Sequence, residues 1–110
     1  DAIVNLGKKQ KISKLGMGFL QDENSWIFMP EYVRFEVSEN GKDFEEVGVV
    51  KNTVSQKAGG GIIKNFEIKL DKAKRIKYIK VFAKNIEKCP EWHKGAGGTS
   101  WLFADEIWFE

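Results

Sequence analysis

The sequence has little of several residue types on which common sites depend. Its 110 residues include one cysteine, Cys89, one histidine, His93, and two prolines. A single cysteine cannot form an intramolecular disulfide, so thiol usage does not identify the compartment. Cys89 and His93 have a ligand-like spacing, but a structural zinc site takes four such ligands and the chain has no further Cys or His. The sequence therefore argues against a disulfide-stapled or zinc-stabilised domain.

Long apolar runs and a large charge excess are also missing. No segment approaches the ~20 apolar residues of a transmembrane helix, and no signal peptide is visible. The net charge is only +2, and no basic stripe suggests contact with several phosphates, so nucleic acid is not an expected partner. The first residue is Asp1 rather than Met, so we expect a processed or excised piece. Length and composition predict one globular domain over residues 1–110.

A sustained 3.6-residue period is missing too, and short alternating segments take its place. The clearest is residues 32–38, where Val33, Phe35 and Val37 share one side. Asn40-Gly41 predicts a tight hairpin turn leading into a partner strand over residues 44–50. Further strands are expected at residues 1–7, 12–20, 66–70, 76–83 and 101–109, with turns at 8–11 and 71–74. Roughly seven short strands predict an all-β fold, an antiparallel β-sandwich.

Two local patterns suggest close packing. Gly16 and Gly18 occupy one face of the second expected strand, which indicates close approach by another layer or a bulge. The loop at residues 21–31 contains Ile27, Phe28 and Met29, and apolar loop residues usually pack against something. We therefore expect this loop to lie on the body of the domain.

The last stretch, residues 89–110, begins as a loop and ends as a strand. Pro90 and three glycines predict irregular backbone, and this loop carries Trp92 and His93. Binding residues often lie on loops that a rigid scaffold positions. The alternative is that Trp92 folds over the core while His93 is solvated. The residues alone leave both interpretations open.

Catalytic arrangements find little support. Asp105 and Glu106 are consecutive in an expected strand and so point to opposite faces, which does not suit a glycosidase pair. A Cys89–His93 nucleophile would need an activating environment that nothing nearby suggests. The glycine clusters at residues 59–61 and 95–98 lack the ending of a phosphate-binding loop. The sequence thus predicts no active site.

Aromatic side chains in loops are the remaining candidates for function. Trp26 and Trp92 lie in expected loops, beside the polar residues Asn24 and His93. An indole can stack on the apolar face of a sugar ring while amide or imidazole groups bond to its hydroxyls. These four residues form a predicted ligand-binding set. We expect their loops, residues 21–30 and 89–100, to converge at one end of the sandwich and to bring Trp26, Trp92 and His93 close together. The other two tryptophans, Trp101 and Trp108, fall in the last strand and are expected in the core.

Four motifs in order resemble coagulation factor 5/8 type C domains, also called discoidin domains. They are VNLGK (residues 4–8), RFEVS with Asn40-Gly41 and Phe44 (34–44), RIKYIKV (75–81) and ADEI (104–107). GFLQ, SWIF, WH and WLF, at residues 18–21, 25–28, 92–93 and 101–103, are similar to versions appended to bacterial chitobiase-type β-hexosaminidases. The resemblance covers nearly the whole chain.

This resemblance implies a jelly-roll, galactose-binding-domain-like sandwich related to family 32 carbohydrate-binding modules. It implies a monomeric, exported bacterial module that binds terminal galactose or N-acetylhexosamine and serves the catalytic domain of a glycoside hydrolase. The family's segment before the LG strand has no counterpart here, so we expect it to be missing. Glu106 matches a glutamate of the family's calcium site, which implies calcium as a structural cofactor. The alternative function is a structural appendage that packs on the parent enzyme and binds no ligand.

Overall fold

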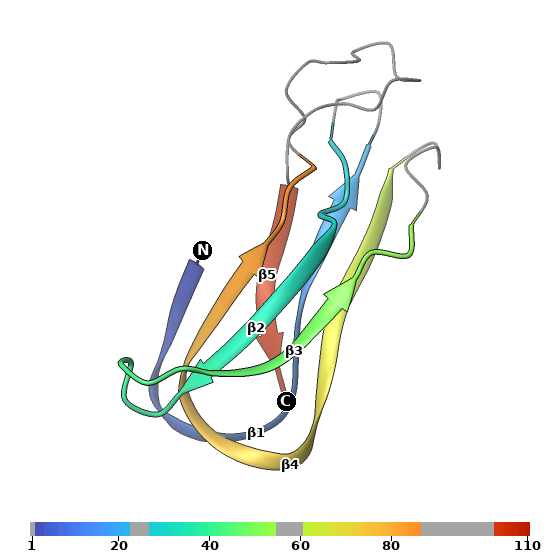
Figure 1. Cartoon of the computed structure of the whole chain (residues 1–110). Helices are drawn as coiled ribbons and strands as arrows, with labels where there is room; N and C mark the ends of the chain where they lie inside the picture. Colours follow the sequence, from blue (N-terminus) through green and yellow to red (C-terminus); the bar gives the residue numbers. More distant parts are fainter. Residues whose placement is uncertain (1, 23–26, 55–60, 87–102) are drawn as a thin grey trace.

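The fold is one open antiparallel sheet of five strands (Figure 1). The computed structural model describes residues 2–22, 27–54, 61–86 and 103–110, and no helix occurs among them. The strands follow the order β3-β2-β4-β1-β5 across the sheet. Their bounds are β1 Ala2–Gln21, β2 Tyr32–Ser38, β3 Glu45–Lys51, β4 Ile62–Ala83 and β5 Phe103–Phe109. The predicted antiparallel all-β class is confirmed, whereas the jelly-roll assignment stays a prediction.

Two strands are much longer than the others, and both bend. β1 and β4 stay paired from Ala2 opposite Val81 to Gln21 opposite Ile62. The register shifts twice, between residues 5 and 10 and between residues 12 and 14 of β1. Such bulges bend a strand and strengthen its twist. The sheet therefore turns back over itself, as in a sandwich, at a corner formed by residues 7–13 and 70–76 (Figure 1).

The corner corrects two expectations from the sequence. Residues 8–11 and 71–74 were expected to be turns, but they belong to the continuous strands β1 and β4. The described residues accordingly form five strands rather than about seven. The reason is that the ladder continues in the middle of the corner, where residues 10–12 pair with residues 74–76. These pairs satisfy backbone groups of both strands, and the two register shifts accommodate residues 6–9 and 70–73 as bulges.

The connection between β2 and β3 is wider than the expected two-residue turn. The last paired residues are Val37 and Glu45. Gly41 has the predicted positive φ, at 78°. The Asn40 side chain closes the turn, because its Oδ1 accepts hydrogen bonds from the backbone N–H groups of Lys42 and Asp43 at 2.8 and 2.9 Å. Side-chain capping of this kind replaces the tight hairpin.

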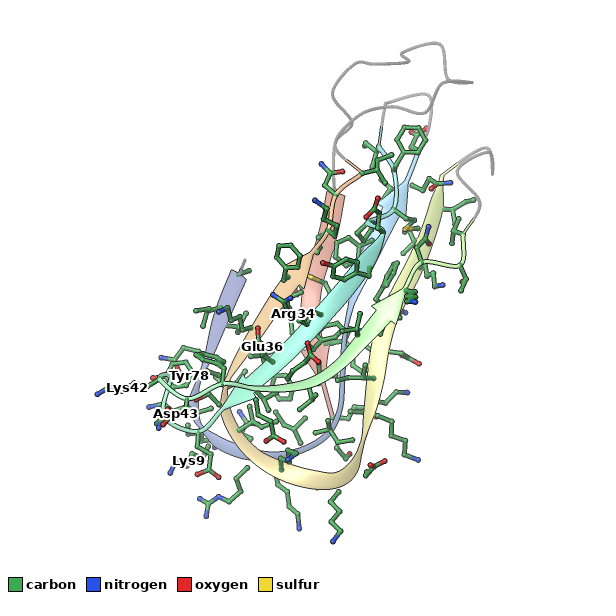
Figure 2. The ribbon with its side chains drawn as sticks, in the orientation of Figure 1. Lys9, Arg34, Glu36, Lys42, Asp43 and Tyr78 are labelled. Carbon is green, nitrogen blue, oxygen red and sulfur yellow. The ribbon has the colours of Figure 1, made fainter. Side chains whose placement is uncertain are left out.

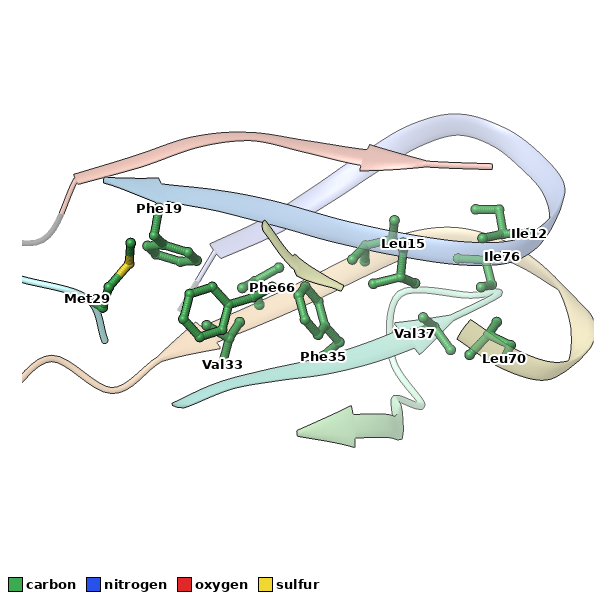
Figure 3. Close-up of a cluster of buried hydrophobic side chains, with 12 residues drawn as sticks. Ile12, Leu15, Phe19, Met29, Val33, Phe35, Val37, Phe66, Leu70 and Ile76 are labelled. Atoms are coloured by element: carbon green, nitrogen blue, oxygen red, sulfur yellow. The ribbon is translucent and has the colours of Figure 1, made fainter. Parts of the chain in front are cut away.

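The core lies between the two halves of the folded sheet (Figure 3). Val33, Phe35 and Val37 point into it as the alternation predicts. Phe19 of β1 and Phe66 of β4 meet edge to face, with ring centroids 5.3 Å apart. The remaining buried members of the cluster are Ile12, Leu15, Met29, Leu70, Ile76, Ile79 and Val81.

Gly16 is closely approached, but by its cross-strand partners in the same sheet and not by another layer. A Cβ at this position would lie 2.7 Å from Cζ2 of Trp108 and 2.9 Å from Cβ of Glu67. The β1–β5 register also shifts between Met17 and Phe19, which is the expected bulge. Trp108 was expected in the core, and this prediction is wrong. The side chain is half-buried against Gly16, on the side away from the core cluster. Trp101 lies outside the described residues.

Candidate functional site

Three connections of the chain start and finish at the same end of the sheet, opposite the corner. They follow β1, β3 and β4, and they lead into β2, β4 and β5 (Figure 1). We call this the loop end, and the opposite end the bend end. β1 and β4 bend at the corner, and both end opposite it, where β4 also begins. Because all neighbouring strands are antiparallel, β2 and β5 begin and β3 ends at this same end of the sheet. The loop end is where the sequence predicts a binding site.

Backbone hydrogen bonds tie the described stems of these connections together. Glu31 is central, because its N–H donates to the Lys84 carbonyl at 2.7 Å and its carbonyl accepts from Asn52 N–H at 3.0 Å. The N–H of Lys84 donates in turn to the Tyr32 carbonyl at 3.0 Å. One residue before β2 therefore links the stems after β3 and β4. Such a network fixes the positions from which the connections leave the sheet.

The stem after β1 is anchored by burial as well. Asp22 and Ile27 exchange backbone hydrogen bonds at 2.9 and 3.0 Å. Phe28 and Met29 are buried, which confirms the expectation that this loop packs on the body of the domain. Gln21 is fully buried, and its Oε1 accepts a hydrogen bond from Met29 N–H at 3.4 Å. The connection therefore starts and ends on fixed positions.

An aromatic patch of Tyr32, Arg34 and Phe82 lies beside the loop end, on the face of β2 and β4 that points away from the core. The rings of Tyr32 and Phe82 are 6.0 Å apart, and Cζ of Arg34 lies 4.9 Å from the Phe82 centroid. Nε of Arg34 is 3.6 Å from a Glu36 carboxylate oxygen and 4.0 Å from one of Glu46. Figure 2 shows Arg34 and Glu36 along β2. Tyr32, Arg34, Glu36 and Phe82 are half-buried and lie against one another, whereas Glu46 is exposed.

This arrangement suits recognition of a polar ligand with apolar faces. Aromatic rings supply flat contact surface at little entropic cost, and a guanidinium supplies directional donors. Carboxylates beside the Arg34 guanidinium can accept hydrogen bonds from hydroxyl groups. These are the groups used to bind a sugar.

The four predicted ligand-binding residues, Asn24, Trp26, Trp92 and His93, lie outside the described residues. The described stems of their two loops, at residues 22 and 27 and at residues 86 and 103, lie at the loop end. The expectation that Trp26, Trp92 and His93 come close together stays a prediction.

Glu106, the predicted calcium ligand, lies in β5 and is exposed. Calcium takes roughly six to eight oxygen ligands. In residues 2–22, 27–54, 61–86 and 103–110, no group of three or more His, Cys, Asp or Glu side chains is placed to hold a metal ion. Calcium binding through Glu106 stays a prediction.

Comparison with protein-family models and with curated protein sequences finds no match to this chain. A search of the described residues for helices that could cross a membrane also finds none.

The sequence alone does not reveal the aromatic patch, although it contains a signal for it. The alternation of β2 already placed Tyr32 and Arg34 on the outer side. Phe82 lies in a segment, residues 76–83, with apolar residues on both faces. One of these faces meets the core, so the other exposes apolar side chains unless a second layer covers it. The pairing of Arg34 with Phe82 brings the two signals together. Only the strand order shows that these residues are neighbours.

Proposed function

We propose that this chain is a non-catalytic carbohydrate-binding module that directs a glycoside hydrolase to its glycans. The ligand would be terminal galactose or an N-acetylhexosamine, and the binding residues would include Trp26, Trp92, Asn24 and His93. The motif resemblance to discoidin domains, and to versions appended to bacterial β-hexosaminidases, supports this class and with it an exported module. A calcium ion near Glu106 is part of the same proposal.

One observation carries the proposal: the stems of three connections meet at one end and are tied together through Glu31. Loops that leave a sandwich from fixed, adjacent stems can build a shared pocket while the sheet remains unchanged. Two of these connections contain Trp26 and Trp92. The aromatic patch adds stacking surface directly beside them, because Tyr32 follows Glu31 in the chain.

The alternative is a structural appendage that packs against the catalytic domain of the parent enzyme without a ligand of its own. Two exposed apolar side chains are compatible with it: Ile3 is 57% exposed and Ile63 is 71% exposed. They lie apart, opposite Lys80 and Leu20, so only a broad contact with another domain would cover both. The two functions therefore predict different sensitive residues, which makes them separable.

A glycan array followed by titration calorimetry tests the proposal. A single stacked sugar should bind with Kd of about 0.1–1 mM. Replacing the indole that makes most of the contact, Trp26→Ala or Trp92→Ala, should cost about 1–3 kcal/mol and abolish measurable binding. His93→Ala should cost about 1 kcal/mol.

The matched control is Tyr78→Ala. It also removes an aromatic ring, but one that lies beside Gly41 at the bend end. This change should leave Kd unaltered. If no glycan raises the melting temperature and both tryptophan variants unfold, the appendage function is the correct one.

A further inference from the structure

The bend end carries a concentration of positive charge that the linear sequence does not show. Residues 8–11 of β1 and 71–75 of β4 contain six basic side chains and one acidic side chain, Asp71. The β1–β4 ladder brings the two segments side by side, with Lys11 opposite Arg75 and Ile12 opposite Lys74. The basic members of this basic corner are Lys8, Lys9, Lys11, Lys72, Lys74 and Arg75.

Few of these charges are neutralised. Lys9 lies 3.8 Å from a Glu39 carboxylate oxygen, and Lys74 lies 3.1 Å from one of Glu45. The other four basic side chains of the corner are exposed. Within the described part of the chain, none of these four forms an ion pair with a carboxylate. An excess of positive charge therefore remains, on a chain whose net charge is only +2.

Lys11 and Arg75 make this excess costly to the fold. They are direct cross-strand partners, and both are exposed. Like charges directly opposite each other destabilise a sheet. An anionic group placed between them would convert repulsion into attraction. The free protein thus holds two cations in an arrangement that favours an anion.

The residues around the charges narrow the class of anion. The apolar side chains of the corner, residues 7–13 and 70–76, are Ile12, Leu70, Ala73 and Ile76, and all but Ala73 are buried. These segments contain no aromatic residue, and the Tyr78 ring at this end is half-buried beside Gly41, on the β2–β3 side (Figure 2). The corner itself therefore has no stacking platform for nucleotide bases and no apolar anchor for a bilayer. Lys8 and Lys11 are separated along β1 by roughly 10 Å of extended chain. Charges spread over such a length fit a polymer with repeated anionic groups.

A neighbouring groove indicates which side such a polymer would occupy. The groove has a volume of about 450 Å³ and lies between the β2–β3 connection and the end of the β4 bend. Its lining includes Glu39, Asp43 and Glu45 besides Lys74 and Arg75. These carboxylates repel an anion from the groove. The favourable path therefore runs outside the groove, over the four exposed basic side chains of the corner that form no ion pair within the described residues. Figure 2 shows Lys9 and Asp43 on the β2–β3 side of this end.

We infer that the basic corner binds a linear acidic polysaccharide, carrying carboxylate or sulfate groups, at a site separate from the loop end. The Lys8, Lys11, Lys72 and Arg75 side chains contact the anionic groups. This site does not depend on the loop end, so it stands or fails independently of the proposed function. A module with both sites would hold one neutral and one acidic glycan at opposite ends.

Retention on immobilised heparin and on immobilised polygalacturonic acid tests the inference, with dextran as the neutral control. The full chain should bind both acidic polymers and not dextran. Affinity should fall roughly 10- to 100-fold between 50 and 200 mM salt, as expected for about four ionic contacts. Lys8→Gln combined with Lys11→Gln should weaken binding about tenfold and reduce the salt slope by about two.

Lys42→Gln combined with Lys51→Gln is the matched control, because it removes the same charge from exposed positions outside the corner. Its affinity should stay within about twofold of the parent. An equal loss in both double variants would show that only net charge matters and would overturn the site. Absence of retention at 50 mM salt would do the same.

Two further probes decide the ligand class. Single-stranded DNA and vesicles containing phosphatidylserine should bind more weakly than the acidic polysaccharides at the same salt concentration. Tighter binding to either would assign the corner to a different class of macromolecule and overturn the inference. Lys11→Gln alone should raise the melting temperature of the ligand-free chain, because it removes the repulsion from Arg75.

Discussion

The two ends of this sheet are held by different interactions. At the loop end, buried side chains and backbone hydrogen bonds fix the stems, as Gln21, Met29 and Glu31 show. At the bend end, two paired strands turn the corner together and present mostly charged side chains to solvent. The core changes in the same direction, from aromatic residues such as Phe19 to aliphatic ones such as Ile12 (Figure 3). A fold can thus separate rigid support for one surface from a charged second surface.

The largest expected effect concerns the two parts of the core. Phe66→Ala should lower the free energy of unfolding by about 3–5 kcal/mol, because it leaves a large cavity and removes the contact with the Phe19 ring. Leu70→Ala, four residues along the same strand, should cost about 2 kcal/mol, at the low end of such changes. Leu70 is 7% exposed and lies at the corner, where the cavity can collapse more easily. Denaturant unfolding measures both values, and an equal cost would show that the core does not differ between the ends.

The next effect concerns the buried amide of the loop end. Gln21→Ala removes the acceptor of the Met29 N–H and should cost about 1–3 kcal/mol. Gln10→Ala, at the partly exposed bend position, should stay within about 0.5 kcal/mol. Thermal melts compare the two variants. Hydrogen exchange at Met29 should accelerate only in Gln21→Ala, and unchanged exchange there would contradict the proposed anchoring.

The smallest expected difference in stability is between glycine substitutions at the two ends. Gly41→Ala should cost about 1–2 kcal/mol, because φ is 78° and the new Cβ would lie 3.0 Å from the Tyr78 ring. Gly61→Ala, beside the loop end, meets nothing within 4 Å and has no positive φ. It should be neutral or stabilise the protein by up to about 1 kcal/mol. If chemical denaturation gave both variants the same midpoint, the strain at Gly41 would be refuted.

The sequence predicted the strands well wherever one face is buried. Val33, Phe35 and Val37 alternate because one side of β2 meets the core, and this period is visible without a structure. The corner was harder to predict. Polar residues at positions 8–11 suit a turn as well as the exposed bend of a continuous strand. Which of the two forms depends on pairing with β4, more than sixty residues away.

The candidate surfaces show the same limit. Tyr32 and Phe82 are separated by fifty positions, and only strand order makes them neighbours. The basic corner likewise combines segments that each look like an ordinary solvated turn. Composition gives the side chains that are present, while topology decides which of them share a surface.

The nested pairing of β1 and β4 has a consequence for folding kinetics. The β2–β3 hairpin closes over a short separation, from Val37 to Glu45, and hairpins of this kind form in roughly 1–10 μs. The β1–β4 ladder instead joins Gln21 to Ile62 at its nearest point and Ala2 to Val81 at its farthest. From contacts this distant we expect slow folding, on the scale of milliseconds to seconds that is typical of two-state β domains. Until the β1–β4 ladder forms, the edge of β4 that faces β1 remains unpaired.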